Sequence, residues 1–342
     1  MIVNRPFFEG PAARGVFASR LIQRVLKSAL VSSSLVMIVT AVATAQEYPT
    51  RPVRLVVGFT AGGPTDVPAR FIADKLSAAL GKPVVVENKP GAGSMLATYD
   101  LLSQRRDGHT LLACTYFDAV NTLLYKNAKY KLSDIAPVTL FSKYDYAIAV
   151  SPNNPAQDFG QLVQYAKENP GKLNYGHLGI GSSQNIMAKK LEKVTGMSMT
   201  AIPYKGAADA LQEVVAGRLD LFIGPPLVVM PLVQSKLVKI LAVTGPERLS
   251  SAPDVPTLSE AGIPLVAFAW LGICAGSGTP EPIINLLNSK LVPIIKSEEF
   301  QKMIEKSGSS PVSSTPNEMQ SVINETVKDA APIVEEFKLY MD

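Results

Sequence analysis

The stretch VRLVVGFTAGGPTDVPARFIADKLSAAL, residues 53–80, decides the fold class. It predicts an apolar strand, a glycine-rich turn and an amphipathic helix in direct succession. Residues 173–194, LNYGHLGIGSSQNIMAKKLEKV, repeat this design. Backbone N–H groups at the start of a helix, together with the positive end of its dipole, attract an anion without a charged side chain. Two such turns in one chain predict that a small anion is captured.

Strand-like and helix-like segments alternate along the rest of the chain, which predicts an α/β fold with mostly parallel sheets flanked by helices. The expected strands are the apolar runs at residues 53–57, 84–86, 111–113, 147–150, 219–223, 240–243 and 271–275.

Pro-rich loops at residues 146–155 and 242–256 predict two crossings between lobes. Lobe 1 is then expected to comprise residues 46–147 and 246–342, and lobe 2 residues 148–245. A double crossing makes a hinge, and hinged lobes can close over a ligand.

The first 45 residues have the pattern of an export signal. Basic residues precede an apolar run at residues 29–43, and Ala43-Thr44-Ala45 predicts cleavage near Ala45. The run is shorter than the ~20 residues of a spanning helix, so a soluble periplasmic product is expected, with an uncleaved anchor as the alternative. Five basic residues and one acidic residue give this segment a surplus of +4, equal to the net charge of the whole chain. The mature protein is therefore near neutral, unlike a nucleic-acid binder.

The chain holds two cysteines, Cys114 and Cys274. In an oxidising compartment they can pair, or they can remain separate buried thiols, and the sequence leaves both alternatives open.

Sequence patterns of common catalytic sites are missing, so no enzyme, cofactor or metal is expected. The chain has no Gly-x-Ser-x-Gly elbow, His-Glu-x-x-His, Cys-x-x-Cys or phosphate-loop lysine motif. Of its two histidines, His109 lies in a predicted turn and His177 flanks the second glycine-rich turn. A pairing of His177 with Ser182 stays open, and a secreted serine hydrolase that uses Ser182 or Ser183 is an alternative.

Pocket residues are expected in loops at the carboxyl ends of strands, where open α/β sheets bind ligands. Glycines in the first turn let the backbone approach a ligand, although they also suit a plain tight connection. Serines in the second turn offer hydroxyls or simply cap a helix. The residues expected in these and two neighbouring turns are Gly62, Gly63, Thr115, Tyr116, Phe117, Asp118, Ser182, Ser183, Tyr204 and Lys205.

Taken together, several short motifs resemble the Bug family, the extracytoplasmic solute receptors of tripartite tricarboxylate transporters. The likeness runs from Tyr48 to the C-terminal helices. Each motif alone is a weak signal, but their order and spacing together are specific for the family. They are YPTRPVRLVV at 48–57, GGPTDVPAR at 62–70, VVENKPGAG at 85–93, DGHTLL at 107–112, PYKG at 203–206, GRLD at 217–220, LAVT at 241–244, PDVPT at 253–257 and EAG at 260–262.

The resemblance implies a two-lobed type II periplasmic binding protein, a Venus flytrap. It also implies that this single chain captures a small carboxylated metabolite between its lobes and delivers it to membrane permease subunits. A sensor that reports the same ligand to a signalling partner is the alternative. The implied ligand contacts are Phe59, Thr60, Ala61, Gly62, Gly63, Asp66, Gly179, Ile180, Gly181, Ser182 and Ser183, with Asp66 ordering the turn.

The sequence departs from the family pattern at a few positions of the expected pocket. Gly58 stands where the family has proline, and Asn185 where it has histidine. The fold is hardly affected by such changes, but the pocket rim can be reshaped, so the identity of the acid is left open.

Overall fold

β1 (Val53–Val57), the strand quoted first, lies inside a six-stranded sheet, where its apolar residues are buried. The computed structural model describes residue 1 and residues 48–341, so the predicted export signal, apart from Met1, lies outside the described residues. In space the strands of this first sheet follow the order β11-β4-β10-β3-β1-β2. The other five are β2 (Val84–Asn88), β3 (Thr110–Thr115), β4 (Ile135–Asp145), β10 (Phe268–Gly276) and β11 (Ser310–Pro311).

A second sheet contains the strands from the middle of the chain, in the order β7-β6-β8-β5-β9. They are β5 (Ala147–Val150), β6 (Asn174–His177), β7 (Thr200–Pro203), β8 (Leu221–Gly224) and β9 (Lys239–Val243). The α/β fold class is confirmed.

Both sheets are mixed, so the prediction of mostly parallel sheets is wrong in that detail. β1 pairs in parallel with β2 and β3, and β6 with β7 and β8. In contrast, β10 is antiparallel to β3 and β4, and β5 to β8 and β9. The reason is that β4 leads out of the first sheet into β5, whereas β10 returns to it after β9. A leaving strand and a returning strand that pair must run in opposite directions.

The two connections between the sheets are bonded to each other. Tyr146, between β4 and β5, accepts from the Thr244 N–H (2.9 Å), and its own N–H donates to the Thr244 hydroxyl (2.8 Å). That hydroxyl donates to the Ala267 carbonyl (2.6 Å), which lies just before β10. Thr244 is fully buried. A single threonine therefore ties together three backbone segments at the place where the chain changes sheets.

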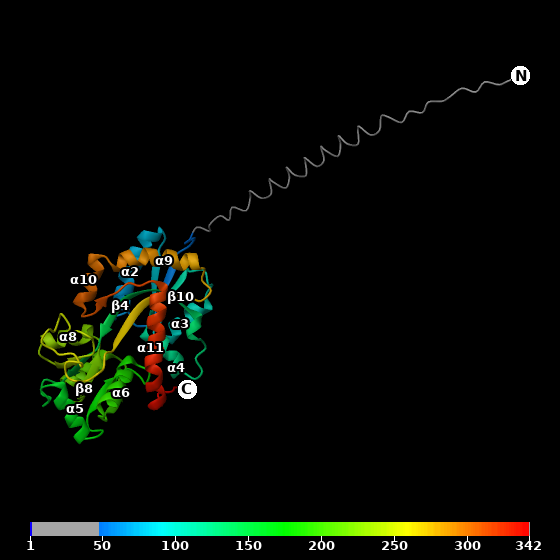
Figure 1. Ribbon diagram of the computed structural model, residues 1–342. Helices are drawn as coiled ribbons and strands as arrows, with labels where there is room; N and C mark the ends of the chain where they lie inside the picture. The colour runs from blue at the N-terminus through cyan, green and yellow to red at the C-terminus, as the bar shows by residue number, and fades with distance from the viewer. Residues whose placement is uncertain (2–47, 342) are drawn as a thin grey trace. The chain divides into compact units, whose positions relative to one another are not determined.

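Helices cover both sheets (Figure 1). Around the first sheet, α2 contacts α9 and α10, while α11 contacts α4 and β4. Around the second sheet, α6 and α7 pack on β6 and β8, and α8 contacts β5. The helices are α2 (Asp66–Leu80), α3 (Met95–Ser103), α4 (Tyr116–Leu124), α5 (Phe159–Glu168), α6 (Ser183–Thr195), α7 (Ala207–Val215), α8 (Pro226–Gln234), α9 (Glu281–Ile295), α10 (Glu298–Lys306) and α11 (Pro316–Glu336), with a short 3-10 helix at Leu132–Asp134.

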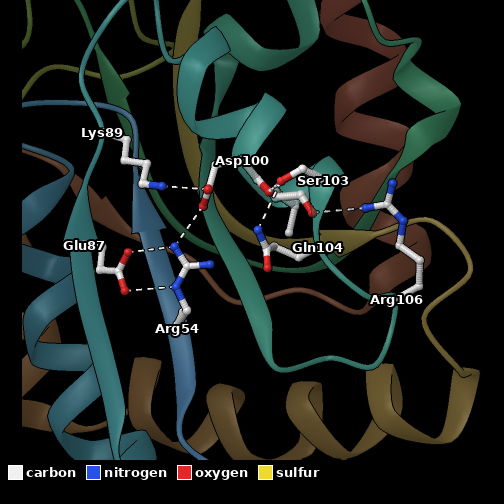
Figure 2. Close-up of polar contacts among 8 residues, drawn as sticks. Arg54, Glu87, Lys89, Asp100, Ser103, Gln104 and Arg106 are labelled. Atoms are coloured by element: carbon white, nitrogen blue, oxygen red, sulfur yellow. Dashed lines mark hydrogen bonds and ion pairs between the residues drawn. The ribbon is translucent and has the colours of Figure 1, made fainter.

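A polar cluster joins β1, β2 and α3 on the first sheet (Figure 2). Arg54 on β1 donates to both carboxylate oxygens of Glu87 (2.9 and 2.7 Å) and to Asp100 (3.0 Å). Lys89 donates to the other oxygen of Asp100 (2.6 Å). The hydrogen bond to Glu87 raises the pKa of Arg54, so this side chain stays charged. The bidentate pair with Glu87 joins β1 to β2, and the bonds to Asp100 join these strands to α3.

Cys114 and Cys274 form a disulfide between β3 and β10. Both are buried, with exposed fractions of 1% and 0%. Of the two alternatives left open by the sequence, the structure has the paired one.

Asp145, the last residue of β4, is expected to make the stability of the protein depend on pH. Its side chain lies against Gly245 at the second connection, where a Cβ atom would overlap the carboxylate. Burial raises its pKa to about 6, although the charge of Lys143 opposes the rise. Because the folded-state pKa lies above the unfolded value, the folded state binds this proton more tightly, and stability falls as pH rises from about 4 to about 6.

Asp145→Asn is therefore expected to stabilise the protein by about 1–2 kcal/mol at pH 8 and to have little effect near pH 4. Thermal unfolding at both pH values measures the difference. The exposed Asp254→Asn serves as the control. An equal effect of Asp145→Asn at the two pH values would contradict this origin.

Candidate functional site

A cavity of about 250 Å³ lies between segments of the two sheets. The first sheet contributes the turn after β1, the start of α4, Tyr144 near the end of β4, and Trp270 and Leu271 at the start of β10. The second sheet contributes residues that follow β6, β7 and β8. The lining residues are Phe59, Thr60, Gly63, Pro64, Thr65, Thr115, Tyr116, Phe117, Tyr144, Leu178, Gln184, Lys205, Gly206, Ala207, Pro225, Val228, Trp270 and Leu271.

A second cavity, of about 450 Å³, shares Gly63, Pro64, Tyr144, Pro225, Val228 and Leu271 with the first. It extends past Gly62 and Val67 to Met303 and Lys306 on α10. The shared residues make the two cavities neighbouring parts of one cleft. Both are lined by the turns after β1 and β8, and only the smaller one is also lined by residues at the turns after β3, β6 and β7.

The first glycine-rich turn is held by Asp66, which is 1% exposed. Its carboxylate accepts from the Gly62 N–H (2.8 Å), Arg70 Nε (2.9 Å) and Asn88 Nδ2 (2.7 Å). Asn88 also donates to the Phe59 carbonyl (2.9 Å). Burial alone would raise the pKa of Asp66, but these hydrogen bonds lower it overall. Asp66 is thus placed where it orders the turn, and it does not line the cavity.

Three helices begin at the cavity without a capping side chain in the described part of the chain. They are α2 after Thr65, α7 after Gly206 and α8 after Pro225, and all three of these preceding residues line the cavity. The first N–H groups of a helix have no partner within the helix. At α2, however, the N–H groups of Asp66 and Val67 donate to the Gly63 carbonyl (both 3.1 Å), and at α8 the Val228 N–H donates to the Pro225 carbonyl (3.2 Å). Among the described residues, the start of α7 has no such bonds to its first N–H groups, so it is the terminus that attracts an anion or a carbonyl oxygen. Asp209, in the first turn of α7, is exposed and lies outside the cavity lining.

At the N-termini of α4 and α6, side chains of the chain itself accept hydrogen bonds from the first N–H groups of the helix. Thr115 and Asp118 form a capping box on α4. Ser182 caps α6, because its hydroxyl accepts from the N–H groups of Asn185 and Leu178 (both 3.3 Å). The α6 terminus, predicted to bind an anion, is thus partly satisfied from within the chain.

The second turn lies mostly outside the cavity lining. Ile180 is 44% exposed, and a Cβ atom on Gly181 would overlap Leu124, so this glycine permits close packing onto α4. Ser183 lies beside Tyr144, whose pKa burial raises to about 12 while this serine opposes the rise. From this region, Leu178 and Gln184 line the cavity instead.

Of the predicted site residues, the structure brings together seven around the cavity: Phe59, Thr60, Gly63, Thr115, Tyr116, Phe117 and Lys205. Gly62 lines the neighbouring cavity. Neither cavity is lined by Ala61, Asp66, Asp118, Gly179, Ile180, Gly181, Ser182, Ser183 or Tyr204. At the turn between β7 and α7, the cavity is lined by Lys205, Gly206 and Ala207. The neighbouring Tyr204 does not line it, and its N–H donates to the His177 carbonyl (2.8 Å).

The sequence did not point to six of the lining residues: Tyr144, Gln184, Pro225, Val228, Trp270 and Leu271. Pro225 could have been found, because it follows an apolar strand and begins a helix, as the other turns do. Trp270 and Leu271 could not be found by looking at carboxyl ends of strands. β10 is antiparallel, so its start lies at the edge where β3 ends.

The departure at Gly58 has a packing consequence. A Cβ atom there would overlap the side chain of Ser94, which is fully buried and has a φ of 76°. The proline of the family pattern would overlap in the same way, so Gly58 and Ser94 fit as a pair.

Ser182 and His177 are engaged elsewhere. The Ser182 hydroxyl caps α6, and the His177 ring accepts from the Gly179 N–H (3.1 Å). Over residues 48–341, no hydrogen bond joins the two side chains, and no group of three or more His, Cys, Asp or Glu could hold a metal ion.

Comparison with known proteins identifies the family. The family model of the tripartite tricarboxylate transporter family receptor, TctC, matches residues 68–339. The chain belongs to this family. The periplasmic binding protein BugD superposes on this TctC-family receptor with a TM-score of 0.75 at 30% identity, over 86% of this chain and 100% of that one. The resemblance to the Bug family is therefore confirmed.

Two further solved structures contain a carboxylate. An R. palustris protein with adipate has a TM-score of 0.77 and 30% identity, over 84% of this receptor and 97% of that chain. MatC from Rhodopseudomonas palustris, with bound malate, has a TM-score of 0.74 and 28% identity, over 84% and 100%. The family is one of transporter receptors, and its relative BugD is a periplasmic binding protein. Within the described residues of this receptor, no helix is both long and apolar enough to cross a bilayer.

Proposed function

We propose that this receptor captures a small carboxylate in the cleft between its two sheets and delivers it to the membrane permease of a tripartite tricarboxylate-type transporter. It acts as a single chain in the periplasm, after cleavage near Ala45 removes the signal at residues 1–45. The lobes that close over the ligand are residues 46–147 with 246–342, and residues 148–245.

The observation that carries the proposal is the uncapped N-terminus of α7 at a cavity that strand-to-helix turns of both sheets line. An anion in this cavity can accept from the first N–H groups of α7, and the glycine-rich turn of the first sheet lines the same cavity. Lys205 adds a positive charge on the side of α7. The adipate and malate in related structures support a carboxylate as the anion.

The proposed contacts combine residues expected from the sequence with residues found in the structure. From the predicted set we keep Phe59, Thr60, Gly63, Thr115, Tyr116 and Lys205 as first contacts, and we add Gly206 and Ala207. The contacts predicted at Gly179–Ser183 stay predictions that depend on how the lobes close.

A thermal-unfolding screen over mono-, di- and tricarboxylic and aromatic acids tests the capture step. An acid present at a hundredfold excess over its dissociation constant should stabilise the protein by about 2.7 kcal/mol. If no acid in the panel moves the transition, capture of carboxylates is disproved. Uptake of the bound acid by cells with and without the receptor tests delivery.

Lys205→Gln is expected to raise the dissociation constant of every acid that binds by about three- to tenfold at low salt. The loss should shrink at high salt, because the lysine is exposed and its field is screened. Isothermal titration measures both, with the exposed Lys172→Gln as the matched control. Equal affinity of wild type and Lys205→Gln at low salt would remove this lysine from the site.

A further inference from the structure

Aromatic rings form one side of the cavity. Phe59, Tyr116, Phe117, Tyr144 and Trp270 all line it, and all come from the first sheet or its turns. The Phe117 ring lies edge-to-face with Phe59, at a centroid distance of 5.7 Å, and with Tyr116, at 6.4 Å. We call these five residues the aromatic wall. Phe59, Phe117 and Tyr144 are half-buried and leave ring surface for another flat ring to pack against, whereas Tyr116 and Trp270 are buried beside them.

Hydrogen bonds to residues outside the cavity lining fix the orientation of the aromatic wall. The Trp270 indole is 1% exposed and donates to the Thr326 hydroxyl of α11 (2.9 Å). The start of α4, which carries Tyr116 and Phe117, is held by Asp118, which accepts from the Thr98 hydroxyl (2.6 Å) and the Thr115 N–H (2.8 Å). Rings fixed in this way lose little conformational freedom when a ligand packs on them.

Charge is scarce on the opposite side. Of the cavity-lining residues in the described chain, Lys205 alone is charged, and it comes from the second sheet beside the uncapped start of α7. Leu178, Pro225 and Val228 make the rest of that side mostly apolar. Taking several carboxylates out of water without a charged partner for each is costly. A ligand with one carboxylate and an apolar body therefore fits this lining better than a polar di- or tricarboxylate.

We propose that the preferred ligand is a small aromatic carboxylate, with its ring packed on the aromatic wall and its carboxylate at Lys205 and the start of α7. The inference rests on the proposed function and narrows it to a ligand class. The cavity of about 250 Å³ lies just below the usual range of drug-sized sites, ~300–1,000 Å³, and adjoins the neighbouring cavity of the cleft, so it has room for a single ring with few substituents.

The test compares benzoate, 4-hydroxybenzoate and phenylacetate with malate, adipate and citrate by isothermal titration of the wild-type protein. The tightest aromatic acid is expected to bind at least about tenfold more tightly than any of the three aliphatic acids. The chain has one tryptophan. Because Trp270 lines the cavity, its fluorescence is expected to change with the same dissociation constant, which places the acid at this site.

Phe117→Leu removes a ring of the aromatic wall and keeps an apolar side chain. It is expected to weaken the aromatic acids about tenfold and to change the affinity for any aliphatic acid that binds by less than about threefold. Tyr165→Leu, an exposed tyrosine of α5 outside the cavity lining, is the matched control.

The outcomes separate this inference from the proposed function. If malate, adipate or citrate binds as tightly as the best aromatic acid, or if Phe117→Leu weakens both classes alike, the aromatic preference is wrong and carboxylate capture stands. If no acid of either class binds, both fail together.

Discussion

Replacing Cys114 and Cys274 together by alanine is expected to lower the free energy of unfolding by about 2–5 kcal/mol. The disulfide joins residues separated by 160 positions. A disulfide that closes so long a loop strongly reduces the conformational entropy of the unfolded chain. Without the bond the unfolded state gains this entropy, so the free energy of unfolding falls. Alanine is the appropriate replacement because both positions are buried and a hydroxyl would add an unsatisfied polar group.

Urea unfolding of the variant and of the wild type, each with and without a thiol reductant, measures the effect. Reduced wild type serves as the matched control and should unfold close to the variant. Equal unfolding midpoints for oxidised wild type and variant would show that the bond adds nothing to stability.

The same change should weaken ligand binding. Thr115 and Leu271 line the cavity and lie opposite each other on β3 and β10, the two strands that the disulfide joins. Loosening these strands loosens one side of the site, so the dissociation constant of a bound acid is expected to rise severalfold.

Asp66→Ala is expected to cost about 2–4 kcal/mol of stability and at least about tenfold in affinity for any acid that binds. The carboxylate is buried and accepts from Gly62, Arg70 and Asn88, so its removal leaves the Gly62 N–H and the Asn88 amide without this acceptor. The turn that presents Thr60 and Gly63 to the cavity then loses its main support.

Chemical unfolding and titration with an acid measure the two effects. Asp74→Ala is the matched control, because Asp74 lies exposed on the same helix. A variant of Asp66 with normal stability but no binding would instead place this carboxylate in direct contact with the ligand.

The contribution of Asp66 also has a predicted pH dependence. The pKa of Asp66 in the folded state lies below its ordinary value in the unfolded chain. The charged carboxylate therefore adds fully to the free energy of unfolding at pH values above the unfolded pKa. This contribution is lost as the pH falls toward and through the folded pKa. The stability difference between wild type and Asp66→Asn should therefore be constant from pH 7 down to about pH 4 and shrink at lower pH. A difference that is independent of pH down to about pH 2 would contradict this origin.

The elements with strong local patterns were predictable from the sequence. The apolar run of β1, the glycine-rich turn and the periodicity of α2 are each encoded within a few neighbouring residues, and the structure has them at those positions. Several pocket residues were predictable for the same reason. Phe59, Thr60 and Gly63 follow β1 directly, and Thr115 and Tyr116 stand where β3 passes into α4.

By itself, then, the sequence determined the α/β class, the family and the turns on the first sheet, because strand, turn and helix preferences act over short distances along the chain. Tertiary structure alone decided that the sheets are mixed, that α7 rather than α6 presents a free N-terminus to the cavity, and that Tyr144 and Trp270 line it. These features depend on which strand returns beside which and on which side chain reaches which helix end. Such pairings join residues far apart in sequence, and no local pattern records them.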